Sequence, residues 1–162
     1  MPDPENIAVI TQTTLSIDDT VPVINALKAK YPKLKFPPKE DICYATTNRQ
    51  GSVKGVAQKA DLVLVIGSVN SSNSLRLAEV SQGVRCRAYL IDDVSEIEPE
   101  WLSGVKVLGI TAGASAPEHL VQEVVAYLKG LGATQVQELE LVREDVNFGL
   151  PLELNQLVAR KA

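Results

Sequence analysis

The sequence predicts an α/β protein built on a parallel sheet, with one complete three-layer lobe and part of a second lobe. Short apolar runs rich in β-branched residues show no alternation of apolar and polar positions, which is typical of strands covered on both faces. Segments with helical spacing separate these runs, and this repeated order favours right-handed crossovers between parallel strands. We expect strands at residues 7–11, 62–67, 88–91 and 106–111.

Helices are predicted between the strands and after the last one. The helix over residues 18–31 follows Ser16, which begins the sequence Ser-Ile-Asp-Asp and is typical of a capping box. The last helix opens at Pro117, because proline is favoured at the first helical position, and it ends at Gly132. Each polar stretch that follows a strand is also expected to lead into a helix.

The domain organisation follows from these elements. Residues 31–42 contain three prolines and mixed charges, and we interpret them as a short strand followed by a hinge. Residues 1–38 then form a partial lobe, since one strand, one helix and one weak strand cannot bury both faces of a sheet. Residues 39–142 form a complete α/β lobe, and residues 143–162 form a C-terminal arm without a firm period.

The composition excludes several classes of protein. With 45% hydrophobic residues, 22% charged residues and a net charge of −4, the chain has the balance of a globular protein. It has no basic stripe for nucleic acid, no apolar run near the roughly 18 residues that cross a bilayer, and no signal peptide. We therefore expect no nucleic acid or membrane partner, a cytoplasmic location (or the plastid stroma in a plastid-bearing source), and reduced cysteines.

Small hydroxyl and amide side chains follow three of the predicted strands, and a fourth stretch of the same kind follows the hinge and Cys43. Since the carboxyl ends of parallel strands share one edge, these residues are expected to line one crevice, and helix N-termini there favour an anion. Serine, threonine and asparagine are also the best helix N-caps, so any one such stretch is more simply explained as a cap. The stretches are residues 11–16, 44–50, 69–74 and 111–118.

The two cysteines and two other single residues need separate interpretation. Cys43 is either a small buried residue or a ligand presented at the mouth of a polar loop. Cys86, which leads into a strand, is interpreted as part of the core or as a partly exposed packing residue. His119 has no second histidine for a metal site or a triad and is interpreted as structural, and Trp101 as a packing anchor.

Together the motifs "DICYATTNRQ", "NSSNS" and "TAGASAPE", in this order, resemble the C-terminal half of the 4-hydroxy-3-methylbut-2-enyl diphosphate reductases, the LytB family. The resemblance runs from about Ile7 to the end of the chain. It implies three α/β lobes around a [4Fe–4S] cluster that is held by three cysteines. It also implies reduction of an allylic diphosphate to isopentenyl and dimethylallyl diphosphate, with electrons from a ferredoxin- or flavodoxin-type donor.

The resemblance assigns roles to particular residues. Cys43 becomes a ligand of the cluster, and Thr13 a catalytic and substrate-binding residue at the hydroxyl end of the substrate, with Gln12 nearby. The residues implied to hold the diphosphate are Ser71, Ser72, Asn73 and Ser115.

The sequence also departs from the family's pattern. The first two cysteine ligands, the histidines around the diphosphate and the central glutamate have no counterpart here, and no lysine or arginine is placed to replace those histidines. We therefore expect a missing N-terminal half as a partner and no stable cluster on this chain alone, because such clusters need several thiolates. The alternative is a non-catalytic module that keeps the fold and binds a diphosphate or another anion.

Overall fold

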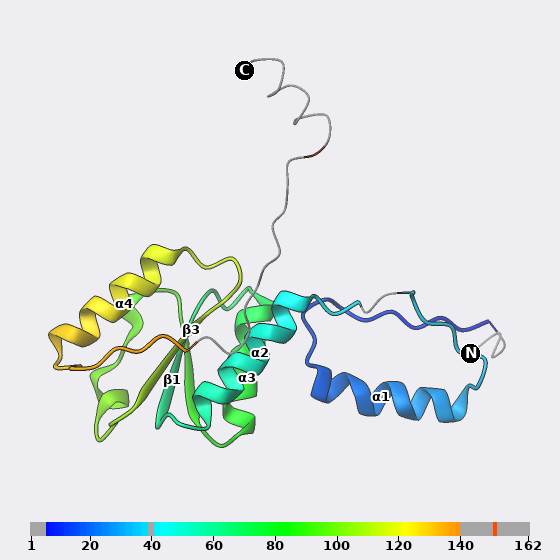
Figure 1. Ribbon diagram of the computed structural model, residues 1–162, viewed down its shortest axis with the longest axis horizontal. Helices are drawn as coiled ribbons and strands as arrows, with labels where there is room; N and C mark the ends of the chain where they lie inside the picture. Colours follow the sequence, from blue (N-terminus) through cyan, green and yellow to red (C-terminus); the bar gives the residue numbers. More distant parts are fainter. Residues whose placement is uncertain (1–5, 39–40, 140–150, 152–162) are drawn as a thin grey trace, which may run out of the picture.

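A computed structural model describes residues 6–38, 41–139 and 151 of the chain (Figure 1). Its elements, in chain order, are α1 (Ile17–Lys30), α2 (Tyr44–Ala57), β1 (Leu62–Ile66), α3 (Ser72–Gly83), β2 (Arg87–Ile91), the short 3₁₀ helices η1 (Val94–Glu96) and η2 (Pro99–Leu102), β3 (Leu108–Ala112) and α4 (Glu118–Gly130). The arm expected at 143–162 lies outside the described residues, apart from Pro151.

The sheet is parallel, as predicted, with the strand order β2-β1-β3. Leu62 at the start of β1 is in register with Arg87 of β2 and with Leu108 of β3. β3 begins two residues later than expected because the Asp61 carboxylate accepts hydrogen bonds from the N–H groups of Lys106 and Val107, both at 2.9 Å, which keeps them out of the ladder. These same bonds, with that from Val107 foremost, lower the pKa of Asp61.

The central strand shows why its sequence is apolar without a break. All five residues of β1 are buried, and their side chains alternate between two hydrophobic clusters. Val63 and Val65 contact the side of the sheet that α2 and α3 cover. Leu62, Leu64 and Ile66 contact the opposite side, which α4 covers (Figure 1). The chain therefore builds three layers of helix, sheet and helix, as the sequence predicted.

The α4 side of the sheet is completed by aromatic side chains. Trp101 of η2 stacks on Tyr89 of β2, with ring centroids 3.9 Å apart and planes 8° from parallel. Both residues pack against the cluster that holds Ile97 and Val124. Trp101 is therefore the packing anchor that the sequence predicted.

The predicted strand at residues 7–11 is wrong. Only Ala8 pairs there, through a single parallel bridge to Lys35, and Ile10 is 81% exposed. Its proposed partner segment continues into Pro37 and Pro38, which have no N–H to donate, so the ladder cannot extend past the bridge. The bridge and α1 extend to one side of the three-layer unit (Figure 1).

Two of the stretches expected to be polar loops are largely helical. α2 begins at Tyr44, so residues 44–50 form its first two turns, and α3 begins at Ser72. The predicted α1 and α4 are confirmed to within one or two residues at each end: Ser16 caps α1 by accepting a bond from the Asp19 N–H at 3.4 Å, and Pro117 is the N-cap of α4. The polar side chains are thus displayed on helix N-termini more than on loops.

A matched pair of glycine substitutions tests the packing of the sheet against α2. Gly109→Ala should destabilise the protein by about 1–3 kcal/mol, because the new Cβ meets the side chains of Val56 and Val63 in a filled layer. Gly51→Ala, in the interior of α2 with open space around it, should stabilise the protein by about 0.5–1 kcal/mol. Urea unfolding curves measure both changes; equal midpoints for the two variants would contradict this packing.

Candidate functional site

The carboxyl ends of β1 and β3 form a topological switch point. β1 leads into α3 on one face of the sheet, and β3 leads into α4 on the opposite face. Two neighbouring parallel strands whose following helices diverge in this way are the place where ligands bind in open α/β sheets, so we expect a crevice outside their ends. The two connections start side by side, because the Gly113 N–H donates to the Ile66 carbonyl at 2.8 Å.

The first wall of this crevice is the N-terminus of α3. Ser71 is its N-cap, and its hydroxyl accepts from the Ser74 N–H at 3.3 Å and lies 3.1 Å from the Ser74 hydroxyl. Ser74 is buried against the β3 connection so closely that a Cβ on Gly113 would clash with its hydroxyl. Ser71 and Ser74 therefore have structural roles in fixing the α3 N-terminus beside the β3–α4 connection.

Asn73 is different from its serine neighbours. It occupies the second position of α3 and is only 8% exposed, yet neither atom of its side-chain amide has a hydrogen-bond partner among the described residues. Leaving a buried polar group unpaired costs about 1–3 kcal/mol, so such a group in a folded protein calls for an explanation. No side-chain cap or hydrogen bond among the described residues accounts for it, and a bound water or a polar ligand would satisfy it.

The second wall is the connection between β3 and α4. Ser115 is exposed in a turn two residues before Pro117, the N-cap of α4. Pro117 provides no side-chain cap, so the N-terminus of α4 keeps N–H groups that side chains do not satisfy. His119 lies on the surface in the first turn of this helix.

Cys43 lies at the N-terminus of α2. It is the N-cap residue, its side chain is exposed, and its thiol makes no capping hydrogen bond. The thiol is therefore available to a ligand, and the alternative of a buried hydrophobe does not hold. A hollow of about 410 Å³ lies beside it, lined by Asp41, Ile42, Cys43, Tyr44, Thr47 and Asn48.

The Thr13 segment adjoins Cys43. The Cys43 N–H donates to the Thr13 carbonyl at 3.1 Å, and the Thr11 N–H donates to the Asp41 carboxylate at 2.8 Å. The side chains of Gln12 and Thr13 are exposed. The structure thus brings Thr13 and Cys43 together, although 30 residues separate them in sequence.

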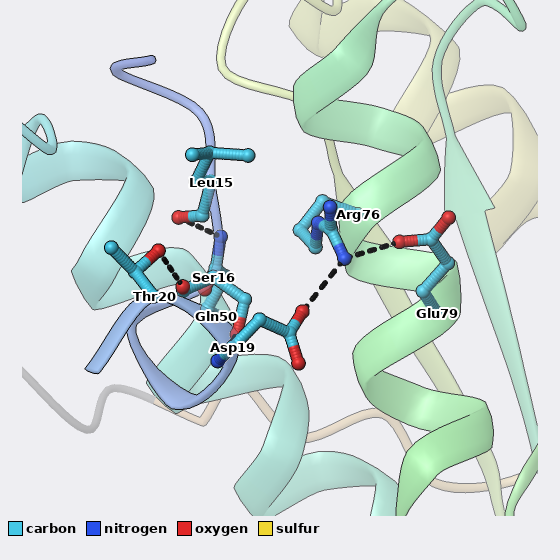
Figure 2. Close-up of polar contacts among 7 residues, drawn as sticks. All are labelled: Leu15, Ser16, Asp19, Thr20, Gln50, Arg76 and Glu79. Atoms are coloured by element: carbon cyan, nitrogen blue, oxygen red, sulfur yellow. Dashed lines mark hydrogen bonds and ion pairs between the residues drawn. The ribbon is translucent and has the colours of Figure 1, made fainter. Parts of the chain in front are cut away.

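Two side chains that the sequence did not indicate hold residues 15–19, which follow Thr13, in place. Gln50 of α2 is buried and donates to the Leu15 carbonyl at 3.3 Å, and Arg76 of α3 bonds the Asp19 carboxylate at 2.9 Å (Figure 2). A signal for Gln50 was present, because it lies at helical spacing among the buried residues of α2, which are Thr46, Gln50, Val53 and Ala57.

Arg49 of α2 places a cation near the crevice, contrary to the expectation from sequence. Its guanidinium donates to the carbonyl of Ala112 at 3.3 Å, at the carboxyl end of β3, and its Nε is buried without a partner among the described residues. It therefore connects the Cys43 helix to the strand that leads to Ser115, and it adds positive charge where an anion is expected.

Cys86 has the opposite environment to Cys43. It is 7% exposed, and its thiol lies within hydrogen-bond distance of the Ala60 and Arg87 carbonyls, at 3.3 and 3.4 Å. Burial, and next the negative charge of Asp61, raise the pKa of the Cys86 thiol. It is a core residue, as predicted.

The chain supplies too few ligands for a cluster of its own. Within residues 6–38 and 41–139 no group of three or more histidine, cysteine, aspartate or glutamate side chains could hold a metal ion. An iron–sulfur cluster is held by several thiolates, and here only Cys43 is exposed. The residues fit one corner of a shared cluster and do not fit a complete site. No helix in the described part of the chain is long and apolar enough to cross a membrane.

A parallel sheet covered by helices on both faces, with a switch point at its carboxyl edge, places the chain in the class of three-layer α/β proteins. Similarity to known proteins identifies the family within this class. The family model of the LytB protein matches residues 1–129, so the chain belongs to the LytB family. It is 58% identical over 152 residues to the 4-hydroxy-3-methylbut-2-enyl diphosphate reductase of Mannheimia succiniciproducens, covering 94% of this chain and 48% of that protein.

Other relatives agree with this membership. The reductase of Leifsonia xyli is 51% identical over 160 residues, covering 98% of this chain and 48% of that protein. A solved reductase structure from Plasmodium falciparum superposes with a TM-score of 0.81 at 31% identity, covering 95% of this chain and 49% of that one. The chain therefore spans about half the length of the reductases that it matches, which agrees with the C-terminal half inferred from the motifs.

The two cysteines offer a direct test of the geometry. In the native chain near pH 8, an alkylating agent should modify Cys43 well before Cys86, because Cys43 is exposed whereas burial shields Cys86 and disfavours its thiolate. Peptide mass spectrometry over time measures both rates. Denaturation in urea is the control and should make the two rates similar; faster native labelling of Cys86 would contradict the assignment.

Proposed function

We propose that this chain forms one part of the active site of a reductase that converts 4-hydroxy-3-methylbut-2-enyl diphosphate to isopentenyl and dimethylallyl diphosphate. The observation that carries the proposal is the meeting, in one structure, of Cys43 with the Thr13 segment and of the α3 N-terminus, through Ser74, with the β3–α4 connection. Membership of the LytB family and the names of the relatives support the reaction.

The diphosphate belongs, in this proposal, at the switch point between β1 and β3. Asn73 presents an amide that pairs with nothing else in the described part of the chain, and Ser72 is exposed beside it. Ser71 and Ser115 add hydroxyl groups on either side, and the N-termini of α3 and α4 add partial positive charge. Arg49 makes the site more cationic than the sequence suggested.

Cys43 is the thiolate that this chain contributes to a [4Fe–4S] cluster. When bound, such a cluster would supply the electrons and a Lewis acid for the loss of the substrate's hydroxyl group. The part played by the chain's own residues is to position the substrate: the α2 N-terminus holds Cys43, and the bond from the Cys43 N–H keeps the Thr13 segment next to it. Thr13 is exposed beside Cys43. It orients the hydroxyl end of the substrate and the proton that this hydroxyl group takes up as it leaves.

In this proposal, residues 1–38 belong to a lobe that is completed by a further stretch of polypeptide. The single bridge at Ala8 leaves a sheet unformed, and apolar side chains of this segment, including Ile10, Val21 and Val23, are 46–81% exposed. The relatives are about twice as long as this chain and therefore contain the polypeptide required. An external electron donor of the ferredoxin or flavodoxin type is part of the same proposal.

A second function, a diphosphate-binding module without redox chemistry, has one observation in its favour. The described part of the chain offers a cluster only one exposed thiol, that of Cys43. All the residues proposed to hold the diphosphate, in contrast, belong to this chain. The two functions share the crevice and differ at Cys43. The module requires no role for that residue, whereas the reductase does.

Titration with inorganic diphosphate tests the crevice. The isolated chain should show NMR shifts at Ser71, Asn73 and Ser115, and Asn73→Ala should weaken binding about tenfold or more, because a bond to a charged group is worth about 1.5–3 kcal/mol. The same substitution should leave the free protein as stable or slightly more stable, since an unpaired buried amide is removed. Asn70→Ala, at an exposed position of the preceding loop, is the matched control and should change neither property.

Iron content and activity test the role of Cys43. The isolated chain should purify with iron well below one cluster per chain and without reductase activity, for lack of ligands. In a chain joined to the N-terminal half of a relative, Cys43→Ala should remove most of the activity and most of the cluster's absorbance, whereas Cys86→Ala should retain both. Full activity of the Cys43→Ala chain would exclude Cys43 as a ligand of the cluster.

A further inference from the structure

The segment that follows Thr13 is held by three side chains from α2 and α3. Gln50 donates to the Leu15 carbonyl at 3.3 Å, and Lys54 and Arg76 pair with the carboxylates of Asp18 and Asp19 at 2.7 and 2.9 Å. Figure 2 shows the Arg76 guanidinium between the carboxylates of Asp19 and Glu79. We call this set the α1 clamp: Leu15, Asp18 and Asp19 on one side, and Gln50, Lys54 and Arg76 on the other.

The clamp lies close to the residues of the proposed site in sequence and in space. Asp19 is six residues after Thr13, Gln50 is seven after Cys43 on the same helix, and Arg76 is three after Asn73, one turn along α3. The contacts of the clamp therefore join the segment after Thr13 to α2, which Cys43 caps, and to α3, which carries Asn73. The chain between α1 and α2 contains three prolines and only one bridge residue, so the fold has few other means of fixing this relation.

We propose that Arg76 and Gln50 are positioning residues of the reductase site: by holding the start of α1 they keep Thr13 against Cys43 and at a fixed distance from the α3 N-terminus. The inference rests on the proposed function, and the observation that links it to the site is the hydrogen bond from the Cys43 N–H to the Thr13 carbonyl, at 3.1 Å. Neither residue contacts the substrate in this proposal. Both act through the backbone that they hold.

The members of the clamp differ in strength. Gln50 is 8% exposed and its bond is shielded from water, so it is expected to contribute most. The carboxylates of Asp18 and Asp19 are 74% and 68% exposed, and salt screens such pairs. Removing one ion pair should therefore loosen the Thr13 segment by a factor of about two to five without unfolding the protein.

The hydrogen-exchange rate of the Cys43 amide measures how firmly the Thr13 segment is held, because its N–H donates to Thr13 and lies before the first turn of α2. NMR on the intact chain should show two- to fivefold faster exchange at Cys43 in Arg76→Gln and Asp19→Asn, and no further increase in the double variant. The matched control is Glu79→Gln, which removes the other partner of Arg76 within α3 and should leave Cys43 exchange unchanged. Exchange of the Leu64 amide in the core should be the same in the wild-type chain and in all four variants.

A charge reversal distinguishes clamping from a general effect of mutation. In a Glu79→Gln background, Arg76→Glu should accelerate Cys43 exchange more than Arg76→Gln, because two carboxylates then face each other, and adding Asp19→Arg should restore the slow rate. Gln50→Leu should give the largest acceleration, about tenfold. High salt should raise the wild-type rate toward that of Arg76→Gln and have little effect on a variant with Lys54→Gln and Arg76→Gln together.

Two results would overturn the inference. One is an unchanged Cys43 rate in Arg76→Gln, and the other is an equal acceleration in Glu79→Gln, which would place the effect within α3 instead of at the junction. These measurements contain no ligand and no iron. Failure of diphosphate binding would thus refute the proposed function with the clamp intact, and an unaltered exchange rate would refute the clamp with the binding site intact.

Discussion

Parallel pairing of β1 with β3, followed by helices on opposite faces, brings together the two connections that carry Ser71, Asn73 and Ser115. The pairing places Ile66 and Ala112 at one edge, and the bond from Gly113 to Ile66 starts both connections from the same place. α3 and α4 then diverge, because each must bury its apolar side against a different face of the sheet. A switch point at this edge is thus a consequence of covering both faces of a buried strand with helices.

The N-terminal segment obeys a different kind of constraint. It contributes little to the two clusters of the sheet, and it is attached through polar contacts: backbone bonds at Thr11 and Cys43, the buried Gln50, and ion pairs at the start of α1. Hydrogen bonds have strict geometry and little tolerance for sliding, whereas apolar contacts permit it. A polar junction therefore fixes the place of Thr13 more narrowly than an apolar junction of the same strength, and it responds to salt.

Much of the fold could be predicted from sequence, because it depends on local signals. Unbroken apolar runs predicted β1, β2 and β3, and Ser16 and Pro117 marked the starts of helices. The strand at residues 7–11 was wrong since an apolar run forms a strand only where a partner can pair along its length, and Pro37 and Pro38 prevent that here. Pairing is a property of two segments, which no inspection of one segment reveals.

The site was partly predictable for the same reason. Ser71 and Asn73 follow β1 and could be placed at one edge by topology alone, and Cys43 was placed beside them because it begins a similar polar stretch. Gln50, Arg76 and Arg49 could not, because each acts on a segment 35 to 63 residues away through a side chain that a surface helix would also carry. For Gln50 the helical spacing with buried neighbours was the one available sign.

The stretch from Asn70 to Ser74 shows how structure separates a cap from a binding site. Capping accounts for Ser71, and close packing against the β3 connection accounts for Ser74. Neither needs Asn73, because serine, alanine or leucine would fill its position in α3 without leaving an amide unpaired. A fold selected for stability alone would lose that amide, since removing an unsatisfied buried group is neutral or favourable. The unpaired amide lies at the N-terminus of a helix, at the switch point of the sheet, and it is the observation that favours a polar ligand at this edge of the protein.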